Sequence, residues 1–543
     1  MFKYFFVLLL FQLVFSQVQE PELLWEYSGC YSSWCERGWY SSPAVDSEDG
    51  VVYASAYSVW KIDLATGEVI WTAPSKGCVG GSADTSVRTW AGIVLADIHG
   101  NGKKRIVVAQ GDGWLNVLDT DGKCDTNFPI KVCDSELRSL AVKDIDDDGY
   151  MEIVVGEAND HLNTYIYNHG GSLLSNWPQK ESETAGYAHG VFDDNIGLIT
   201  VEDKEYIFVP SDVHYIMAYT LDGEPIPANE KFPKETWGEC GIHLNEEDDI
   251  RGYASCSNNA IRPNFADSPI NYVEIDGENR IVVIGNEYDC GTDNYEPQFL
   301  SPYIFNIDRT RFVNSKYNWT VVPQTKTPIE PNYGDYNKIE SISWKPVTVD
   351  IDGGDIEIIF PASDGCLHVY NLDKTEPYNW PYCIGTSSNV KYFSEPVVAD
   401  LDNDGYAEII VTSWGEKESG ENGNLFVFNY KGEVLYSIEL PDAKSDSWNG
   451  GLAAPSLGKL DGGEGDVVIV VNTAYAGVCA YTIPETSDAE FLWKTGRGNL
   501  GRYGNSEEKM SNGGGTNTNT TSASQFVTLF FSLNLILLLC LFI

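Results

Sequence analysis

Apolar residues alternate with polar ones in short runs along most of this chain, and each run ends in a polar turn. LNVLDTDGK from Leu115, LHVYNLDKT from Leu367 and LFVFNYKGE from Leu425 are three of these runs. Alternation places the apolar side chains on one face of an extended segment, which predicts β-strands joined by turns. Almost no stretch sustains the period of an amphipathic helix. We therefore predict an all-β fold.

A second motif lies upstream of each of these turns. A Val- and Ile-rich run there meets an acidic or glycine-rich loop and continues in another apolar run, as in VKDIDDDGYMEIVVGE from Val142 and VVADLDNDGYAEIIVTS from Val397. The two motifs together recur about eight times with a period of roughly 50 residues, which is typical of propeller blades with four strands each. We expect a single β-propeller of about eight four-stranded blades over residues 17–505, with seven blades as the alternative.

The ends of this region bear on how the ring closes. The segment LLWEY from Leu23 is the candidate for a strand that joins the last blade, since closed propellers often combine their first and last strands. A row of tandem β-sandwiches is the competing architecture. No segment before about Asn505 has the composition of a linker, which favours the ring.

Two acidic loops share the spacing D-x-D-x-D-G-x-x-E. Ca²⁺ takes six to eight oxygen ligands, and alternate side chains of a tight loop can all point at one ion. Without a cation these carboxylates would repel one another and oppose the turn. We expect calcium rather than magnesium, which prefers a small octahedron; an acidic turn without metal is the alternative. The expected ligands are the side chains of Asp144, Asp146, Asp148, Glu152, Asp400, Asp402, Asp404 and Glu408 and the backbone carbonyls of Tyr150 and Tyr406.

Four other copies of this loop have lost ligands. The copy at Asp97 has His99 at the third place and Arg105 at the ninth, and the copy at Asp350 is one residue short before Glu357. The copies that begin at Asp276 and Asp461 lack most of the acidic positions. We assign no metal to these four loops.

The two intact loops, which lead into EIVV and EIIV, resemble FG-GAP/VCBS repeats, the blades of integrin-alpha-like propellers. This resemblance implies calcium in the loops and a role in adhesion or recognition. The first blade, from Ser41 to Trp71, instead resembles the repeats of quinoprotein-type propellers.

The two termini predict an exported protein held at the cell surface. Residues 1–16 have one lysine and an apolar core before a plausible cleavage site, as in a secretory signal. Residues 526–543 form an apolar tail behind a Gly-, Asn- and Thr-rich stalk and spacer at 506–525, as in a GPI-attachment signal. A terminal transmembrane helix is the alternative. We place the attachment near Asn512, Gly513 and Gly514.

The charge of the chain limits the classes of partner that we expect. The chain has 80 acidic and 35 basic residues, so it would repel a phosphate backbone, and nucleic acid is not expected as a partner. Asn318 begins an N-W-T sequon, a glycosylation site on an exported protein.

Cysteines in an oxidising compartment are expected to form disulfides. Local spacing suggests four pairs, with at least one further thiol left free because the exported part has an odd number. The suggested pairs are Cys30 with Cys35, Cys124 with Cys133, Cys240 with Cys256 and Cys366 with Cys383.

Catalytic motifs are lacking. None of the seven histidines falls in a zinc-protease motif, and there is no G-x-S-x-G elbow. We expect a non-enzymatic module that binds an extracellular protein or glycan, with recognition loops in the insertions at 224–257 and 288–303. The alternative is a carbohydrate-active enzyme on a propeller scaffold, with its acidic pair hidden among the many carboxylates.

Overall fold

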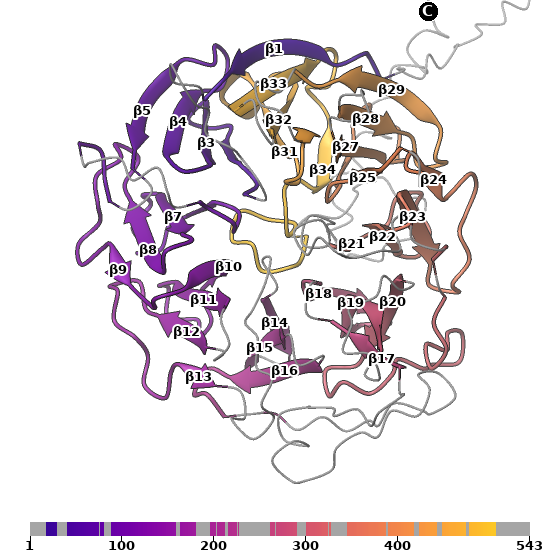
Figure 1. Cartoon of the computed structure of the whole chain (residues 1–543), viewed down its shortest axis with the longest axis horizontal. Coiled ribbons are helices and arrows are strands. Elements are labelled where there is room, and N and C mark those ends of the chain that lie inside the picture. Colours follow the sequence, from indigo (N-terminus) through magenta and orange to yellow (C-terminus); the bar gives the residue numbers. More distant parts are fainter. Residues whose placement is uncertain are drawn as a thin grey trace, which may run out of the picture.

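The computed structural model is a closed ring of eight β-sheets within the part of the chain that it describes (Figure 1). These sheets are the blades of a propeller, and we number them 1 to 8 in chain order. The described residues are 18–29, 41–74, 77–80, 88–158, 163–180, 196–201, 204–211, 215–224, 226, 261–265, 268–289, 300–323, 325–326, 329, 345–386, 389–416, 423–441, 448–473 and 477–506. The signal at 1–16, the attachment residues Asn512, Gly513 and Gly514 and the tail at 526–543 lie outside them.

The strands of the first four blades run from the ring centre outwards in chain order. Blade 1 contains β2 (Ala44–Asp46), β3 (Val51–Ser55), β4 (Val59–Asp63) and β5 (Val69–Ala73). Blade 2 contains β6 (Val94–Ala96), β7 (Arg105–Ala109), β8 (Trp114–Leu118) and β9 (Ile130–Lys131). Blade 3 contains β10 (Glu136–Lys143), β11 (Glu152–Ala158), β12 (Asn163–Tyr167) and β13 (Gln179–Lys180). Blade 4 contains β14 (Gly197–Val201), β15 (Lys204–Ser211) and β16 (Tyr215–Thr220).

The remaining blades carry some additional strands. Blade 5 contains β17 (Ile261–Asn264), β18 (Asn271–Ile275), β19 (Glu278–Asp289) and β20 (Leu300–Phe305). Blade 6 contains β21 (Val347–Val349), β22 (Glu357–Pro361), β23 (Cys366–Asn371) and β24 (Tyr382–Cys383). Blade 7 contains β26 (Val397–Asp400), β27 (Glu408–Glu416), β28 (Asn424–Phe428) and β29 (Val434–Glu439), and β25 (Lys391–Phe393), β30 (Trp448–Gly450) and β34 (Glu490–Trp493) extend its sheet. Blade 8 contains β31 (Ser456–Lys459), β32 (Val467–Thr473) and β33 (Gly477–Ile483). A 3₁₀ turn at Asp461–Gly463 lies between β31 and β32.

The Val- and Ile-rich runs are the second strands of the blades. In β11 every residue from Glu152 to Glu157 is buried, because each face of the sheet packs against a neighbouring blade. Outer strands such as β5 alternate between buried or half-buried and exposed positions instead. The apolar core is therefore distributed between blades, with clusters such as the one that joins β10 and β11 to β6 and β7.

The ring closes through the N-terminus, as the sequence predicted. Strand β1 (Glu22–Tyr27) pairs antiparallel with β33, with Leu23 opposite Tyr481 and Tyr27 opposite Val478, and becomes the outer strand of blade 8. Trp25 of this strand donates its indole N–H to the carbonyl oxygen of Leu64 in blade 1 at 2.8 Å. The first strand of the chain thus holds the last blade to the first.

A segment outside the repeated motifs lies at the centre of the ring. After β34 the chain runs around the central axis, seen as the yellow loop at the middle of Figure 1. We call residues 494–505 the central segment. Its carbonyl oxygens accept backbone hydrogen bonds from inner strands of five blades, through the N–H groups of Leu95, Val142, Leu198, Tyr272 and Leu457.

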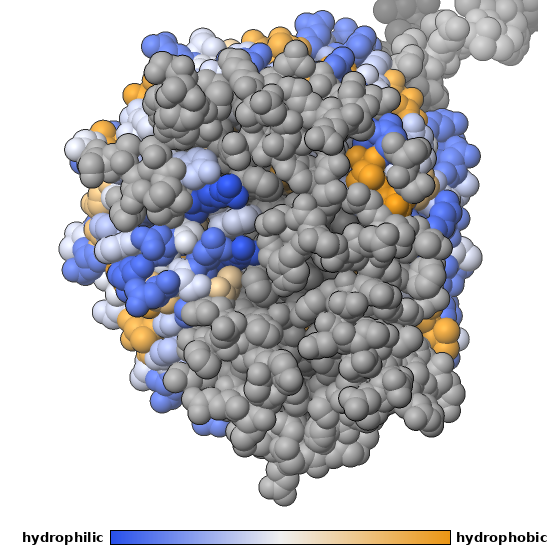
Figure 2. Space-filling model, in the orientation of Figure 1, coloured by the Kyte–Doolittle hydropathy of each residue, from blue (hydrophilic) through white to orange (hydrophobic). Residues whose placement is uncertain are grey.

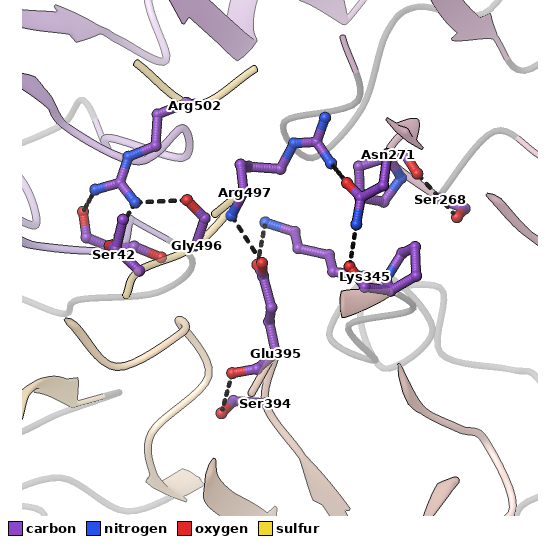
Figure 3. A network of polar contacts seen from close by, with 12 residues as sticks. Ser42, Ser268, Asn271, Lys345, Ser394, Glu395, Gly496, Arg497 and Arg502 are labelled. Atoms are coloured by element: carbon purple, nitrogen blue, oxygen red, sulfur yellow. Dashed lines mark hydrogen bonds and ion pairs between the residues drawn. The ribbon is translucent and has the colours of Figure 1, made fainter. Parts of the chain in front are cut away.

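Two buried arginines of the central segment bind backbone carbonyls of the surrounding blades (Figure 3). The Arg502 guanidinium donates to the carbonyl oxygens of Ser42, Pro43 and Ile93 at 2.8–3.1 Å. Arg497 donates to those of Ile196 and Ile270 at 2.9 and 2.6 Å. A guanidinium has five N–H donors in a fixed fork, so one side chain can satisfy carbonyls from two neighbouring blades.

Two disulfides lie within the described part of the chain. Cys366 pairs with Cys383, directly opposite it on β24, as predicted. The predicted pair of Cys124 with Cys133 is wrong, because Cys124 is bonded to Cys78 and Cys133 is free. Cys124 lies at the Leu118 end of β8, whereas β9 carries the chain back along the sheet before Cys133. Cys30, Cys35, Cys240 and Cys256 lie outside the described residues.

Part of the surface is markedly hydrophilic. Figure 2 shows hydrophilic side chains gathered over β7 to β10 on the face that it presents. Among the described residues, no helix has both the length and the apolar character needed to span a bilayer.

Candidate metal centres

The two intact acidic loops lie on one face of the ring, on opposite sides of it. One joins β10 to β11 in blade 3 and the other joins β26 to β27 in blade 7, four blades further on. Neighbouring strands in each blade are antiparallel, so all loops between a first and a second strand open onto the same face. We call this the acidic face.

Both loops are folded by the same set of hydrogen bonds. In blade 3 the Asp144 carboxylate accepts from the N–H groups of Asp148 and Gly149 at 3.2 and 3.0 Å, and Asp148 accepts from Tyr150 N–H at 2.8 Å. In blade 7 the corresponding three distances are 3.1, 2.9 and 2.9 Å. Gly149 and Gly405 have φ of 86° and 87°, the left-handed conformation that the spacing requires of glycine here.

The glutamate at the ninth place of each loop is buried where the second strand begins. One oxygen of Glu152 accepts from Ile145 N–H at 2.9 Å, and Glu408 accepts from Leu401 N–H at the same distance. This contact turns the carboxylate back towards the loop. The loop is thereby held from both ends, by its first aspartate and by its glutamate.

The carboxylates of each loop converge. One oxygen each from Asp144, Asp146 and Glu152 lies within 4.8 Å of the others, and the same holds for Asp400, Asp402 and Asp404. The structure thus brings together three predicted ligands in each loop, while Asp148 and Glu408 take part through the hydrogen bonds given above. Tyr150 and Tyr406 occupy matching places, and their rings stack on His169 and Tyr430 at 4.3 and 4.4 Å between centroids.

Burial and mutual repulsion shift the pKa values of these groups upwards. Burial, with the charges of the neighbouring aspartates, raises the pKa of Glu408 to about 9 and that of Glu152 to about 7. The same causes raise the pKa of Asp402 to about 6. An ionised loop is therefore unfavourable by itself, and a bound divalent cation would remove the cost.

One atom in blade 7 specifically fits a metal ligand. Oδ1 of Asp402 is buried and accepts no hydrogen bond from the part of the chain that the structure describes. A buried carboxylate oxygen without a partner is costly. All-oxygen donor sets of this kind suit Ca²⁺. The residues present therefore fit the ion that the sequence predicted.

The degenerate loop of blade 6 differs from its expected form. Asp350, Asp352 and Glu357 also place one oxygen each within 4.8 Å of the others, and Glu357 accepts from Ile351 N–H at 3.0 Å. Burial raises the pKa of Glu357 to about 9. The missing residue shortens the turn without moving the strand glutamate away. The D-x-D opening and the glutamate at the start of β22 were the sequence signals for this third cluster.

The degenerate loop of blade 2 is held by other contacts. Arg105 forms its ion pair with Asp125, in the segment that follows β8, and not with Asp97. His99 bridges Asp125 at 2.9 Å and His169 of blade 3 at 2.8 Å. The basic side chain thus links neighbouring segments and does not replace a cation inside the loop.

A fourth group, around His368, is unsuited to metal. Cys366 is part of a disulfide, and both ring nitrogens of His368 are engaged, by Asp364 at 3.0 Å and Glu376 at 2.6 Å. Burial alone would lower the pKa of His368, but these two carboxylates raise it. The group is a buried ion-pair network of blade 6.

The remaining predicted site lies on the surface. Asn318 is exposed, and its side-chain oxygen accepts from the Thr320 N–H and hydroxyl at 3.0 and 2.7 Å. The sequon is therefore on an accessible turn. Most of the two proposed recognition insertions, 224–257 and 288–303, lies outside the described residues.

No protein-family model matches this sequence, and no curated protein matches it. Similar solved structures include the Dos1 propeller, with 10% identity, a TM-score of 0.47 and coverage of 85% of this chain and 95% of that chain. BBS1N in complex with ARL6DN, from a mercury-soaked crystal, has 12% identity and a TM-score of 0.39 over 82% and 99% of the two chains. BamB from Moraxella catarrhalis has 12% identity and a TM-score of 0.40 over 82% and 99%. The assignment of eight blades rests on the sheet order of this chain itself.

Proposed function

We propose that this chain is a calcium-stabilised propeller of the FG-GAP/VCBS type, displayed at the cell surface by a lipid anchor, that binds an extracellular protein or glycan. The observation that carries the metal assignment is the repeated geometry of the loops in blades 3 and 7. Two loops, far apart in sequence, share the same capping hydrogen bonds and the same convergence of carboxylates. Asp144, Asp146, Asp148 and Glu152 would hold one ion, and Asp400, Asp402, Asp404 and Glu408 the other.

The acidic face also supports the recognition role. Next to the blade 7 loop, Tyr378 and Tyr406 are 55% and 39% exposed, and Tyr378 packs edge-on against Tyr430 at 5.3 Å. Exposed rings that are fixed by their neighbours offer contact area at a small entropic cost. Together with nearby carboxylates they provide stacking surfaces and hydrogen-bond acceptors suited to a sugar.

Calcium titration of the full chain tests the metal assignment. We expect chelation to lower the Tm and added calcium to restore it, because binding to the native state alone stabilises that state. Asp146→Asn combined with Asp402→Asn should reduce this calcium-dependent shift to a small remainder. Asp121→Asn, in an exposed turn of blade 2, is the matched control and should keep the full shift. Equal Tm values with and without chelator in the unmodified protein would rule out the metal.

The partner is tested separately. A glycan array and a pull-down from extracellular material, each probed with the calcium-loaded full chain, should show binding that Tyr378→Ala with Tyr406→Ala weakens. Binding that persists at full strength in this variant would place recognition elsewhere on the ring.

A further inference from the structure

A cavity lies at the inner edge of blades 8, 1 and 2, next to the start of the degenerate blade 2 loop at Asp97. Its volume is about 380 Å³. Apolar side chains from the inner strands β2, β6 and β31, from β34 and from the central segment form its walls, and these are Val45, Leu95, Leu457, Phe491 and Leu500. A cavity of this volume, apolar but with a few polar groups, is typical of small-molecule sites.

The central segment forms part of this cavity. Leu500 and Lys494 line it, and their backbone carbonyls are fixed by the N–H groups of Leu95 and Leu457 at 3.2 and 2.7 Å. Arg502 anchors the same segment to blades 1 and 2. The cavity is thus built on rigid elements, as a preorganised site requires.

One wall of the cavity carries a carboxylate that the protein satisfies only in part. Asp46 is 3% exposed, and its Oδ1 pairs with Lys104 at 2.8 Å. Its Oδ2 is buried without a hydrogen-bond partner among the described residues. Lys104 is also paired with Glu48 at 2.9 Å, so its charge is already balanced. Oδ2 is therefore an acceptor available to a ligand.

A second charge in the cavity is a cation. The ammonium group of Lys494 forms no ion pair or hydrogen bond with the part of the chain that the structure describes, although the side chain is half-buried. Asp97, which also lines the cavity, accepts from the N–H groups of Asn101 and Gly102, and these hydrogen bonds lower the pKa of its carboxyl. Two aspartates and two lysines give the lining no net charge.

We propose that this cavity binds a small zwitterion with an apolar side chain, such as a free aliphatic amino acid. The ligand ammonium would donate to Oδ2 of Asp46, and its carboxylate would accept from Lys494. The aliphatic group would lie against Leu95, Leu457 and Leu500. A ligand without an ammonium would leave Oδ2 of Asp46 with no donor, and a ligand without a carboxylate would leave the Lys494 ammonium with no acceptor. A buried polar group without a partner is costly.

Calorimetric titration of the full chain with L-leucine tests this proposal. L-Leucinamide, which lacks the carboxylate charge, and N-acetyl-L-leucine, which lacks the ammonium, are the matched probes. Leucine should bind, and each analogue should bind about tenfold more weakly or worse, as expected for the loss of one charge-assisted hydrogen bond. Absence of leucine binding at millimolar concentration, or tighter binding of either analogue, overturns the proposal.

Two variants locate the site. Lys494→Met should weaken leucine about tenfold and leave leucinamide unchanged, because only leucine has the carboxylate that Lys494 would meet. Lys431→Met, a half-buried control in blade 7, should change neither. Asp46→Asn is checked first for an unchanged Tm and should then weaken leucine but not N-acetyl-leucine. Leucine affinity that is equal in the unmodified and Lys494→Met proteins contradicts the assignment.

Discussion

At the scale of single residues, this protein places carboxylates where they are unfavourable as anions. Glu408 and Glu357 are buried at the start of their strands, and each has one oxygen fixed by a backbone N–H. The same hydrogen bond that orients the carboxylate also keeps it among the aspartates of the loop. Burial of these side chains therefore opposes their ionisation in the metal-free fold, and the proposed cation would offset this cost.

The raised pKa of Glu408 predicts how the stability of the metal-free protein depends on pH. The folded pKa of Glu408, about 9, lies above the ordinary glutamate pKa of 4.5, so the folded state binds the proton more tightly than the unfolded state does. The contribution of protonated Glu408 to stability is complete below its unfolded pKa and is lost as the pH rises towards its folded pKa. We expect the Tm of the chelated protein to fall between about pH 5 and about pH 8, and calcium to reduce this fall.

Glu408→Gln separates this effect from the general charge of the chain. In chelator at about pH 8 the variant should melt about 2 °C or more above the unmodified protein, because the buried charge is gone. With calcium present it should gain less from the ion than the unmodified protein does. Glu433→Gln, exposed in the same blade, is the control. A variant that melts lower than the parent in chelator would contradict the pKa argument.

At the scale of elements, the closing strand β1 is held to blade 8 by its pairing with β33 and to blade 1 by Trp25. The Trp25 ring covers the turn at Gly67, where an added Cβ would lie 2.7 Å from the indole. Trp25→Ala should lower the free energy of unfolding by about 3 kcal/mol, through lost burial and the lost hydrogen bond to Leu64. Leu23→Ala on the same strand should cost about 0.5 kcal/mol or less, since Leu23 is 54% exposed. Denaturant unfolding of both variants checks this, and similar costs would show that β1 does not close the ring through Trp25.

The sequence predicted elements whose information is local or periodic. The blade repeat, the closing strand at Leu23 and the pair of Cys366 with Cys383 follow from alternation and short spacing. The bond between Cys78 and Cys124 joins separate segments, and spacing along the chain cannot indicate it. The blade 6 cluster was missed because counting positions does not show that a shorter turn still reaches Glu357. Arg497 and Arg502 lie outside the repeated blade motifs, so the sequence pattern did not predict their position at the centre of the ring.

At the scale of the whole molecule, the blades are joined at the ring axis by hydrogen bonds to the central segment. Inner strands present backbone N–H groups towards the axis, and those of Leu95, Val142 and Tyr272 donate to carbonyl oxygens of the central segment. Arg502 lies so close to blade 2 that a Cβ on Gly92 would be 2.9 Å from its Nε. The buried guanidinium thus joins the backbones of blades 1 and 2, in addition to the apolar side-chain packing between these blades.

Arg502→Met should therefore loosen one sector of the ring. Methionine fills similar space but donates nothing, so the carbonyls of Ser42, Pro43 and Ile93 lose their hydrogen bonds from the guanidinium, at a cost of about 3 kcal/mol. Hydrogen exchange should accelerate at the Leu95 amide, which bonds to Leu500 of the central segment, and remain unchanged at amides of β22 in blade 6. A uniform acceleration over all blades would mean that the arginine supports global stability, and exchange unchanged at Leu95 would mean that the backbone contacts hold the segment without it.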